Sequence, residues 1–434
     1  MDTSELSNAW RAGGRLYADA VNDFVVRGMR DGWSEKEPEF PDQQTPLADA
    51  VLQVVREANR SGHAGTLRER FPPAILPFAS RLKSEGRALD PALWIDDEHI
   101  ALRIGAPYEA GPVVIADAHG ISECPGLLGF GRSHDGTFYA WAKDTGIEIR
   151  RGWNGDIVTT LPWPSRFENI PASRQKPGTP TPLTITKLSV FPDGQRVLLT
   201  SPRGIFILTS DRAVQLLPRA DEYRKYVDDF ENAEKFELSM EHAALSPDGT
   251  LILAGHQSSA HLVFDARGKQ IATLDPRSEY PHHAWFSADG RIAGFNSCHL
   301  YNGESFGIAI ADLQGASHIA YDHPKARTLQ EGARVYTAVA RDDEFIIGDA
   351  HGYLRAFDSQ GNFRWQYFIG GTLCSLDLSR DGRKLAVSSY AGILCILDLE
   401  SPERDPYAIG TGSRHPVELW RWLFWKSEER PLRW

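Results

Sequence analysis

Four residues in the middle of the chain have types and spacing suited to acid/base or metal chemistry. His242 and His283 each stand six residues before the aspartate of an Asp-Gly pair, and Glu241 and His282 stand one residue earlier still. Imidazole and carboxylate groups together can bind a divalent metal or transfer protons. The alternative is structural, with these side chains hydrogen-bonding to loop backbone. The spacing leaves both interpretations open.

The rest of the sequence offers little support for metal or phosphate chemistry. It contains no G-x-x-x-x-G-K-[ST] phosphate-binding loop and no H-E-x-x-H metal motif. Its four cysteines (Cys124, Cys298, Cys374 and Cys395) are far apart and form no C-x-x-C pair, which argues against structural zinc. We therefore predict no bound metal and no cofactor.

Composition narrows the class of partner. The chain has 434 residues, of which 41% are hydrophobic, so a sizeable core is available. Its formal net charge of -11 argues against broad nucleic-acid binding, which needs a basic surface. No apolar run is long enough for a membrane helix, and Met1–Glu5 begins the chain without a secretory pattern. We expect a cytoplasmic protein with no nucleic-acid or membrane partner.

A repeat that begins near residue 90 would position the histidines. Each unit has an apolar strand, a tight turn that usually contains Asp-Gly, a second strand and a third strand that ends in Asp. Glycine accepts positive φ at such turns, and aspartate hydrogen-bonds to the backbone two residues on. Successive turn aspartates are 38 to 58 residues apart, as expected for repeats with insertions. They are Asp97, Asp135, Asp193, Asp248, Asp289, Asp343 and Asp381.

The third strands of the units share an alternating apolar pattern, which is typical of strands packed between neighbouring sheets. They are expected at residues 113–117, 261–265, 308–312, 353–358 and 393–398. Seven turns predict seven units of this kind.

The repeat resembles the WD-repeat and quinoprotein-like propeller families. Ser246-Pro247-Asp248-Gly249 stands where WD repeats have their first turn, and Phe264-Asp265 and Phe357-Asp358 stand where they have Trp-Asp. The run from Gly352 to Trp365 is similar to a quinoprotein repeat. The Trp-Asp dipeptide itself and a regular Gly-His pair are absent, so the resemblance, over roughly residues 90 to 410, implies a fold and no subfamily. That fold is an all-β, seven-bladed β-propeller, in which His242 and His283 would lie near the channel mouth.

The sequence on either side of the repeat suggests a division into three parts. Residues 1–88 are expected to be helical, because Leu6, Trp10, Tyr17 and Val21 recur at near-helical spacing. The propeller is assigned to residues 89–412 and an aromatic C-terminal tail to residues 413–434. The helical segment would either pack on one face of the propeller and stabilise it or dock a partner.

The C-terminal tail concentrates tryptophan. It contains Trp420, Trp422, Trp425 and Trp434, which we predict to bind a partner, since exposed aromatic clusters mark interfaces. The alternative is that the tail folds back on the propeller as a closing strand or plug.

These observations favour a non-catalytic protein-interaction scaffold that binds protein partners through the propeller faces or the tail. Two alternatives stay open. One is a propeller enzyme, a hydrolase or lyase, with Glu241, His242, His282 and His283 at the channel mouth. The other is a sensor that binds a small ligand in the channel. One fold hosts many functions, so the fold does not choose among them.

Overall fold

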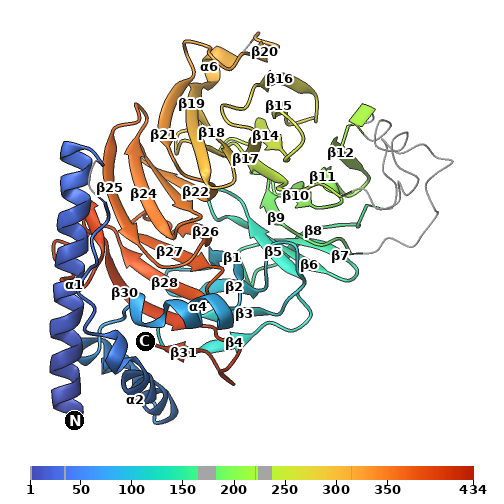
Figure 1. The fold of residues 1–434 in the computed structure, drawn as a ribbon. Coiled ribbons are helices and arrows are strands. Elements are labelled where there is room, and N and C mark those ends of the chain that lie inside the picture. The colour runs from blue at the N-terminus through green and yellow to red at the C-terminus, as the bar shows by residue number, and fades with distance from the viewer. Residues whose placement is uncertain (1, 34–35, 165–181, 220, 223–236, 314) are drawn as a thin grey trace, which may run out of the picture.

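The computed structural model describes residues 2–33, 36–164, 182–219, 221–222, 237–313 and 315–434. Within these ranges most of the chain forms antiparallel strands, arranged as sheets around a centre (Figure 1). The strands of each sheet pair mainly in chain order, so each sheet is built on an antiparallel meander. The first sheet comprises β1 (Leu89–Trp94), β2 (Ile100–Ile104), β3 (Val113–Ala116) and β4 (Ile121–Glu123).

The second sheet has eight strands. It comprises β5 (Gly129–Arg132), β6 (Phe138–Lys143), β7 (Gly146–Arg151), β8 (Ile157–Leu161), β9 (Lys187–Val190), β10 (Val197–Ser201), β11 (Gly204–Leu208) and β12 (Ala213–Leu217). One parallel register pair, Arg132 with Ser189, joins β5 to β9, so this sheet is two four-stranded meanders meeting at their first strands.

Four further sheets follow. The third has β13 (His242–Leu245), β14 (Leu251–Gly255), β15 (His261–Asp265), β16 (Gln270–Leu274) and β20 (His318–Ile319). The fourth has β17 (Tyr280–Phe286), β18 (Ile292–His299), β19 (Asn302–Ala309) and β21 (Arg327–Glu331). The fifth has β22 (Val335–Arg341), β23 (Glu344–Asp349), β24 (Tyr353–Asp358), β25 (Phe363–Phe368) and β29 (Gly410–Gly412). The last has β26 (Leu373–Leu378), β27 (Lys384–Ser389), β28 (Ile393–Asp398), β30 (Val417–Leu423) and β31 (Leu432–Arg433).

This succession of meanders is a β-propeller, so the predicted fold class is confirmed. The innermost strands from β5 to β26 contact one another in succession, and β1 of the first sheet contacts β26 of the last. The number seven depends on counting the eight-stranded sheet as two blades, and it stays a prediction.

The predicted aspartate turns all connect the first and second strands of a meander. In four of them a serine two residues before the aspartate donates its hydroxyl to the carboxylate at 2.6–2.7 Å. The same serine oxygen accepts the backbone N–H at the start of the second strand, for example Leu251 N–H to Ser246 Oγ. The serine and aspartate side chains therefore stabilise the turn through hydrogen bonds within a few residues, which explains why these turns can be recognised in the sequence.

One predicted third strand is wrong in its second half. Residues 308–312 were expected to be extended, but β19 ends at Ala309 and the short helix α6 (Ile310–Leu313) follows. The neighbouring strand β18 begins at Ile292, opposite Ala309, so the chain has no strand partner beyond that residue. The strand ends where its neighbour ends, and the alternation of apolar residues along one segment cannot indicate where that is.

The N-terminal region is helical, as predicted. It contains α1 (Thr3–Asp31), α2 (Ala48–Arg60), α3 (Leu67–Arg70) and α4 (Ala79–Glu85), with short 3₁₀ turns η1 (Thr45–Leu47), η2 (Ala64–Thr66) and η3 (Leu76–Phe78). The helix α1 starts with a capping box, in which Asp2 accepts the N–H groups of Ser4 and Glu5 and Glu5 accepts that of Asp2. None of the helices in the described ranges is both long and apolar enough to cross a bilayer.

Two of these helices contact the outer strands of the last two sheets. The helix α1 contacts β29, and α2 contacts β31 (Figure 1). Strand β30, which lies beyond residue 412, pairs along β28 and forms the outer part of the last sheet. The last sheet thus extends past the division placed between the propeller and the tail.

Candidate functional site

The four predicted histidine and glutamate residues lie where the innermost strands begin, but they do not converge. The rings of His242 and His283 have centroids 6.4 Å apart. Glu241 instead accepts a hydrogen bond from the Thr186 hydroxyl. His282 is turned toward the next sheet, where its Nδ1–H donates to the Val335 carbonyl at 2.6 Å.

Burial keeps these imidazoles neutral. It lowers the pKa of His242 to about 4 and, with help from the Arg334 charge, lowers that of His282 to about 3. No group of three His, Cys, Asp or Glu residues within the described ranges is placed to hold a metal ion. The contacts of His242 and His282 are those of the structural alternative, and His282 has a specific partner, because its Nε2 accepts from Arg334 Nε at 2.9 Å.

A further sequence match proves to be structural. Residues 303–307 have the G-x-S-x-G spacing of a hydrolase nucleophile elbow, with Ser305 as the central serine. That motif works only when the serine sits on a sharp, exposed turn between a strand and a helix. Here Ser305 is buried in the middle of β19, and its hydroxyl accepts from Asn296 Nδ2 at 3.0 Å. The serine has none of the geometry of a nucleophile.

The tail tryptophans are built into the fold. Trp422, Trp425 and Trp434 are buried, and Trp420 is partly buried. Trp422 Nε1 donates to the Asp117 carbonyl of the first sheet at 2.8 Å, and Trp434 Nε1 donates to the Phe71 carbonyl of the helical region at 2.7 Å. This geometry is that of a closing strand. Partner binding by these side chains would require the tail to leave its sheet.

Exposed apolar residues gather on one face of the ring. We call the side on which the innermost strands begin the start face, and the side with the aspartate turns the turn face. On the start face, Leu300 and Tyr301 form the β18–β19 turn and are 69% and 58% exposed. Met240 precedes β13 and Tyr280 begins β17, and both are also exposed. We name Met240, Tyr280, Leu300 and Tyr301 the start-face patch.

Two residues of the start-face patch are held in a costly backbone conformation. Met240 has φ 57° and Leu300 has φ 53°, in the left-handed region that bulky side chains rarely adopt. Such a residue costs on the order of 1 kcal/mol, and surrounding contacts must maintain it. Arg334 supplies two of them, donating from Nη1 to the Leu300 carbonyl and from Nη2 to Met240 Sδ, both at 3.3 Å.

The Arg334 side chain is held in place by two residues of the neighbouring strands. Its Nε donates to His282, and its guanidinium lies 5.1 Å from the ring centroid of Tyr336. It forms no ion pair with any carboxylate in the described part of the chain. One feature of the sequence points to this surface, since Leu300-Tyr301 places two bulky apolar residues in a turn that is normally polar.

The centre of the ring holds a cavity of about 740 Å³ at its turn-face end. Its walls come from the innermost strands and include Leu93, Ala244, Ala284, Val339 and Leu376. Within it, Arg132 Nη2 pairs with Asp377 Oδ1 at 2.5 Å. Lys187 at the start of β9 also lines it, with its side chain accessible to water from inside.

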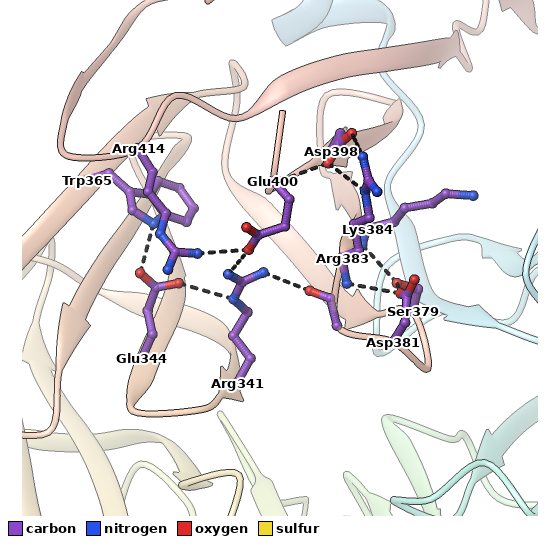
Figure 2. A network of polar contacts seen from close by, with 11 residues as sticks. Arg341, Glu344, Trp365, Ser379, Asp381, Arg383, Lys384, Asp398, Glu400 and Arg414 are labelled. Atoms are coloured by element: carbon purple, nitrogen blue, oxygen red, sulfur yellow. Dashed lines mark hydrogen bonds and ion pairs between the residues drawn. The ribbon is translucent and has the colours of Figure 1, made fainter. Parts of the chain in front are cut away.

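The turn-face rim of the last two sheets is a closed network of charges, drawn in Figure 2. Arg341 contacts Glu344 and Glu400 and donates to the Gly382 carbonyl at 2.8 Å, while Arg414 pairs with Glu400 at 3.0 Å. On the neighbouring strands Arg383 pairs with Asp398 at 3.2 Å. Each arginine has a carboxylate partner inside the network. Arg341 of the fifth sheet reaches Glu400, which follows the last strand of the β26–β28 meander, so this pair braces two sheets, whereas Arg383 and Asp398 belong to the last sheet alone.

Comparison with known proteins gives likeness of fold only. No protein-family model matches the chain, and no curated protein sequence matches it. Among solved structures it is similar to a chain of a mitotic checkpoint complex, at 13% identity and a TM-score of 0.49 over 71% of this chain and 86% of that one. It is also similar to the Cps50 (Swd1) propeller domain of Myceliophteria thermophila, at 12% identity and a TM-score of 0.45 over 67% of this chain and 89% of that one.

A third similar structure is a hydrazine synthase of Kuenenia stuttgartiensis, at 11% identity and a TM-score of 0.42 over 63% of this chain and 77% of that one. These values lie too low to carry function from one protein to another. The fold itself rests on the strand topology of this chain. That topology is a β-propeller, the fold that the turns and third strands predicted.

Proposed function

We propose that this protein is a non-catalytic interaction scaffold that binds a protein partner through the start-face patch. The observation that carries the proposal is the patch itself. Four bulky apolar side chains from three separate loops are exposed together, although ordinary turns on this face would be polar. Two of them are held at positive φ, a cost that a merely solvated loop would not need.

The chemistry around the patch indicates the kind of partner. Arg334 donates to Met240 and Leu300 and pairs with no carboxylate of the described residues. Arginine next to exposed aromatic residues is the composition most enriched at energetic centres of interfaces. We therefore infer a partner segment that is mainly apolar and contributes one carboxylate to Arg334.

The test compares matched variants in affinity purification with quantitative mass spectrometry. The double variant Leu300→Asp/Tyr301→Ala disrupts the patch, and Tyr321→Ala is the control, because Tyr321 is 55% exposed but lies outside the patch. We expect at least one protein to be recovered with the wild type and the control and to be lost with the double variant. Arg334→Gln should weaken recovery of that same protein, and the loss should be greater at low ionic strength than at high.

Two outcomes would contradict the proposal. One is an identical set of recovered proteins for all variants. The other is loss of the same proteins from the Tyr321→Ala control, which would mean that any exposed aromatic ring supports binding, inside the start-face patch or outside it. Circular dichroism of each variant establishes that the propeller is folded before the comparison is made.

A further inference from the structure

One contact of the start-face patch joins a strong hydrogen-bond donor to a weak acceptor. Arg334 Nη2 donates to Met240 Sδ at 3.3 Å. A thioether sulfur accepts hydrogen bonds weakly, whereas a guanidinium is charged and has five N–H donors. The other hydrogen bonds that the Arg334 side chain makes with described residues go to His282 and to the Leu300 carbonyl. An oxygen atom on the Met240 sulfur would therefore bind Arg334 more strongly than the sulfur does.

Oxidation of the thioether supplies such an oxygen at that place. Hydrogen peroxide transfers one oxygen atom to the sulfur, so that the O–O bond breaks and an S–O bond forms. The sulfur is oxidised by two electrons, and the peroxide is reduced to water. The product, methionine sulfoxide, is polar, and reductases return it to the thioether, so the step is reversible.

The backbone keeps Met240 beside Arg334. Its carbonyl accepts from His242 Nδ1–H at 3.0 Å, and its φ of 57° fixes the direction in which the side chain leaves the loop. The side chain is 39% exposed, so a peroxide in solution can reach the sulfur.

A second methionine provides a matched comparison. The chain contains three methionines, Met1, Met29 and Met240. Met29 is 43% exposed, close to the value for Met240, but its sulfur accepts from the neutral Thr411 hydroxyl at 3.8 Å. Both sulfurs are therefore accessible to an oxidant. Among the described residues, a guanidinium donates to the sulfur of Met240 alone.

We propose that Met240 is a reversible oxidation site that controls access to Arg334 at the start-face patch. The inference rests on the function proposed above, in which a carboxylate of the partner binds Arg334. While Met240 is a thioether, that carboxylate displaces only a weak contact. When Met240 is a sulfoxide, the carboxylate must displace an oxygen from the guanidinium, so oxidation weakens binding. One hydrogen bond to a charged group corresponds to about tenfold in affinity.

The first test measures Arg334 directly and needs no partner. Phenylglyoxal modifies accessible arginine side chains, and peptide mass spectrometry of the full chain gives the rate at Arg334. After treatment with hydrogen peroxide, we expect this rate to fall at least threefold in the wild type and in Met29→Leu, and to stay unchanged in Met240→Leu. A methionine sulfoxide reductase should restore the wild-type rate. Met240→Gln, which places an amide oxygen near the guanidinium, should have the low rate without peroxide.

The second test measures partner binding by the affinity purification described above. The proteins that depend on Leu300 and Tyr301 should be recovered about tenfold less well with peroxide-treated wild type than with untreated wild type. Recovery with peroxide-treated Met240→Leu should equal that with the untreated variant. Circular dichroism establishes that each treated protein is folded.

The proposal is overturned if oxidation of Met240 leaves the Arg334 rate or the recovery of these proteins unchanged. It is also overturned if the rate falls equally in peroxide-treated Met240→Leu, or if Met240 stays reduced while Met29 is oxidised. If Met240→Leu does not fold, reversal by the reductase in Met29→Leu decides the question, because Met1 and Met240 are the methionines left in that variant. Failure of the proposed function is a different result, in which no recovered protein depends on Leu300 and Tyr301.

Discussion

The ring closes between its first and last sheets without a shared strand, and Asp377 makes several of the polar contacts that join them. All four strands of the first sheet come from the start of the propeller, and those of the last sheet come from its end. Asp377 of β26 bridges the seam, accepting from Trp94 N–H of β1 at 2.7 Å and from Arg132 Nη2 of β5 at 2.5 Å. One buried carboxylate thus joins three sheets.

Asp377→Ala should destabilise the protein by about 3–5 kcal/mol. The substitution leaves the Arg132 guanidinium mostly buried without a carboxylate, and removing one member of a buried pair costs about that much. It also leaves the Trp94 N–H without its acceptor, a loss of roughly 1–3 kcal/mol when counted alone. The two losses share one side chain and do not add fully. Asp377→Asn keeps an acceptor for Trp94 and should cost less.

Urea unfolding followed by circular dichroism measures the free energy, and hydrogen exchange locates the change. Amides of β1 and β26 should exchange faster in Asp377→Ala than in the wild type, whereas those of β14 and β15, on the other side of the ring, should respond last. Asp31→Ala is the control, because Asp31 forms an exposed pair with Arg30. An Asp377→Ala midpoint equal to that of the control would refute the contribution of Asp377 to closing the ring.

Two further predictions concern acid and the tail. Lowering the pH from 7 to 5 should destabilise the protein. His242 and His282 have native pKa values of about 4 and about 3, below the unfolded value near 6.5. Between pH 7 and 5 the unfolded chain therefore binds protons that the native state does not, and His242 alone accounts for roughly 2 kcal/mol of lost stability at pH 5. An unfolding midpoint that does not change between pH 7 and 5 would contradict this assignment. Trp434→Ala should lower the free energy of unfolding in urea by about 3–5 kcal/mol, because Trp434 is buried against Phe78 and donates to the Phe71 carbonyl. Trp33→Ala, at an exposed ring, should lower it far less. Equal losses in the two variants would show that the tail is not part of the core.

The features that could be predicted from the sequence are those that short segments decide. The turn at Ser246-Pro247-Asp248-Gly249 is recognisable because Ser246 and Asp248 bond to each other and to backbone within five residues. The alternation along β24 and β28 is recognisable because both sides of each strand pack against neighbouring sheets. Both signals act at short range, so they survive in a single sequence.

The features that escaped prediction depend on partners far along the chain. Strand β30 pairs with β28 and sends Trp422 to a carbonyl of the first sheet 305 residues away, so its aromatic run resembles an exposed interface until the fold is known. His282 and Arg334 are 52 residues apart, and no local pattern links them. Strand register also decides to which side of a sheet each side chain points, because adjacent residues point to opposite sides. Glu241 and His242 therefore differ in partners although the sequence presents them as one cluster.

Whether a charged side chain has an oppositely charged partner distinguishes structural residues from candidate binding residues better than its residue type does. Arg421 is buried and pairs with Glu418, which also holds Arg68, and this set joins the tail to the helical region. Arg341, Arg383 and Arg414 are likewise satisfied on the turn-face rim. A charge held against apolar surroundings raises the free energy of the folded state unless a partner offsets it. Arg334 has no carboxylate partner among the described residues and borders the exposed start-face patch. A partner that binds only the folded chain stabilises it by an amount that grows with the ratio of free partner concentration to dissociation constant. Binding at the start-face patch is therefore measurable as stabilisation even before the natural partner is identified.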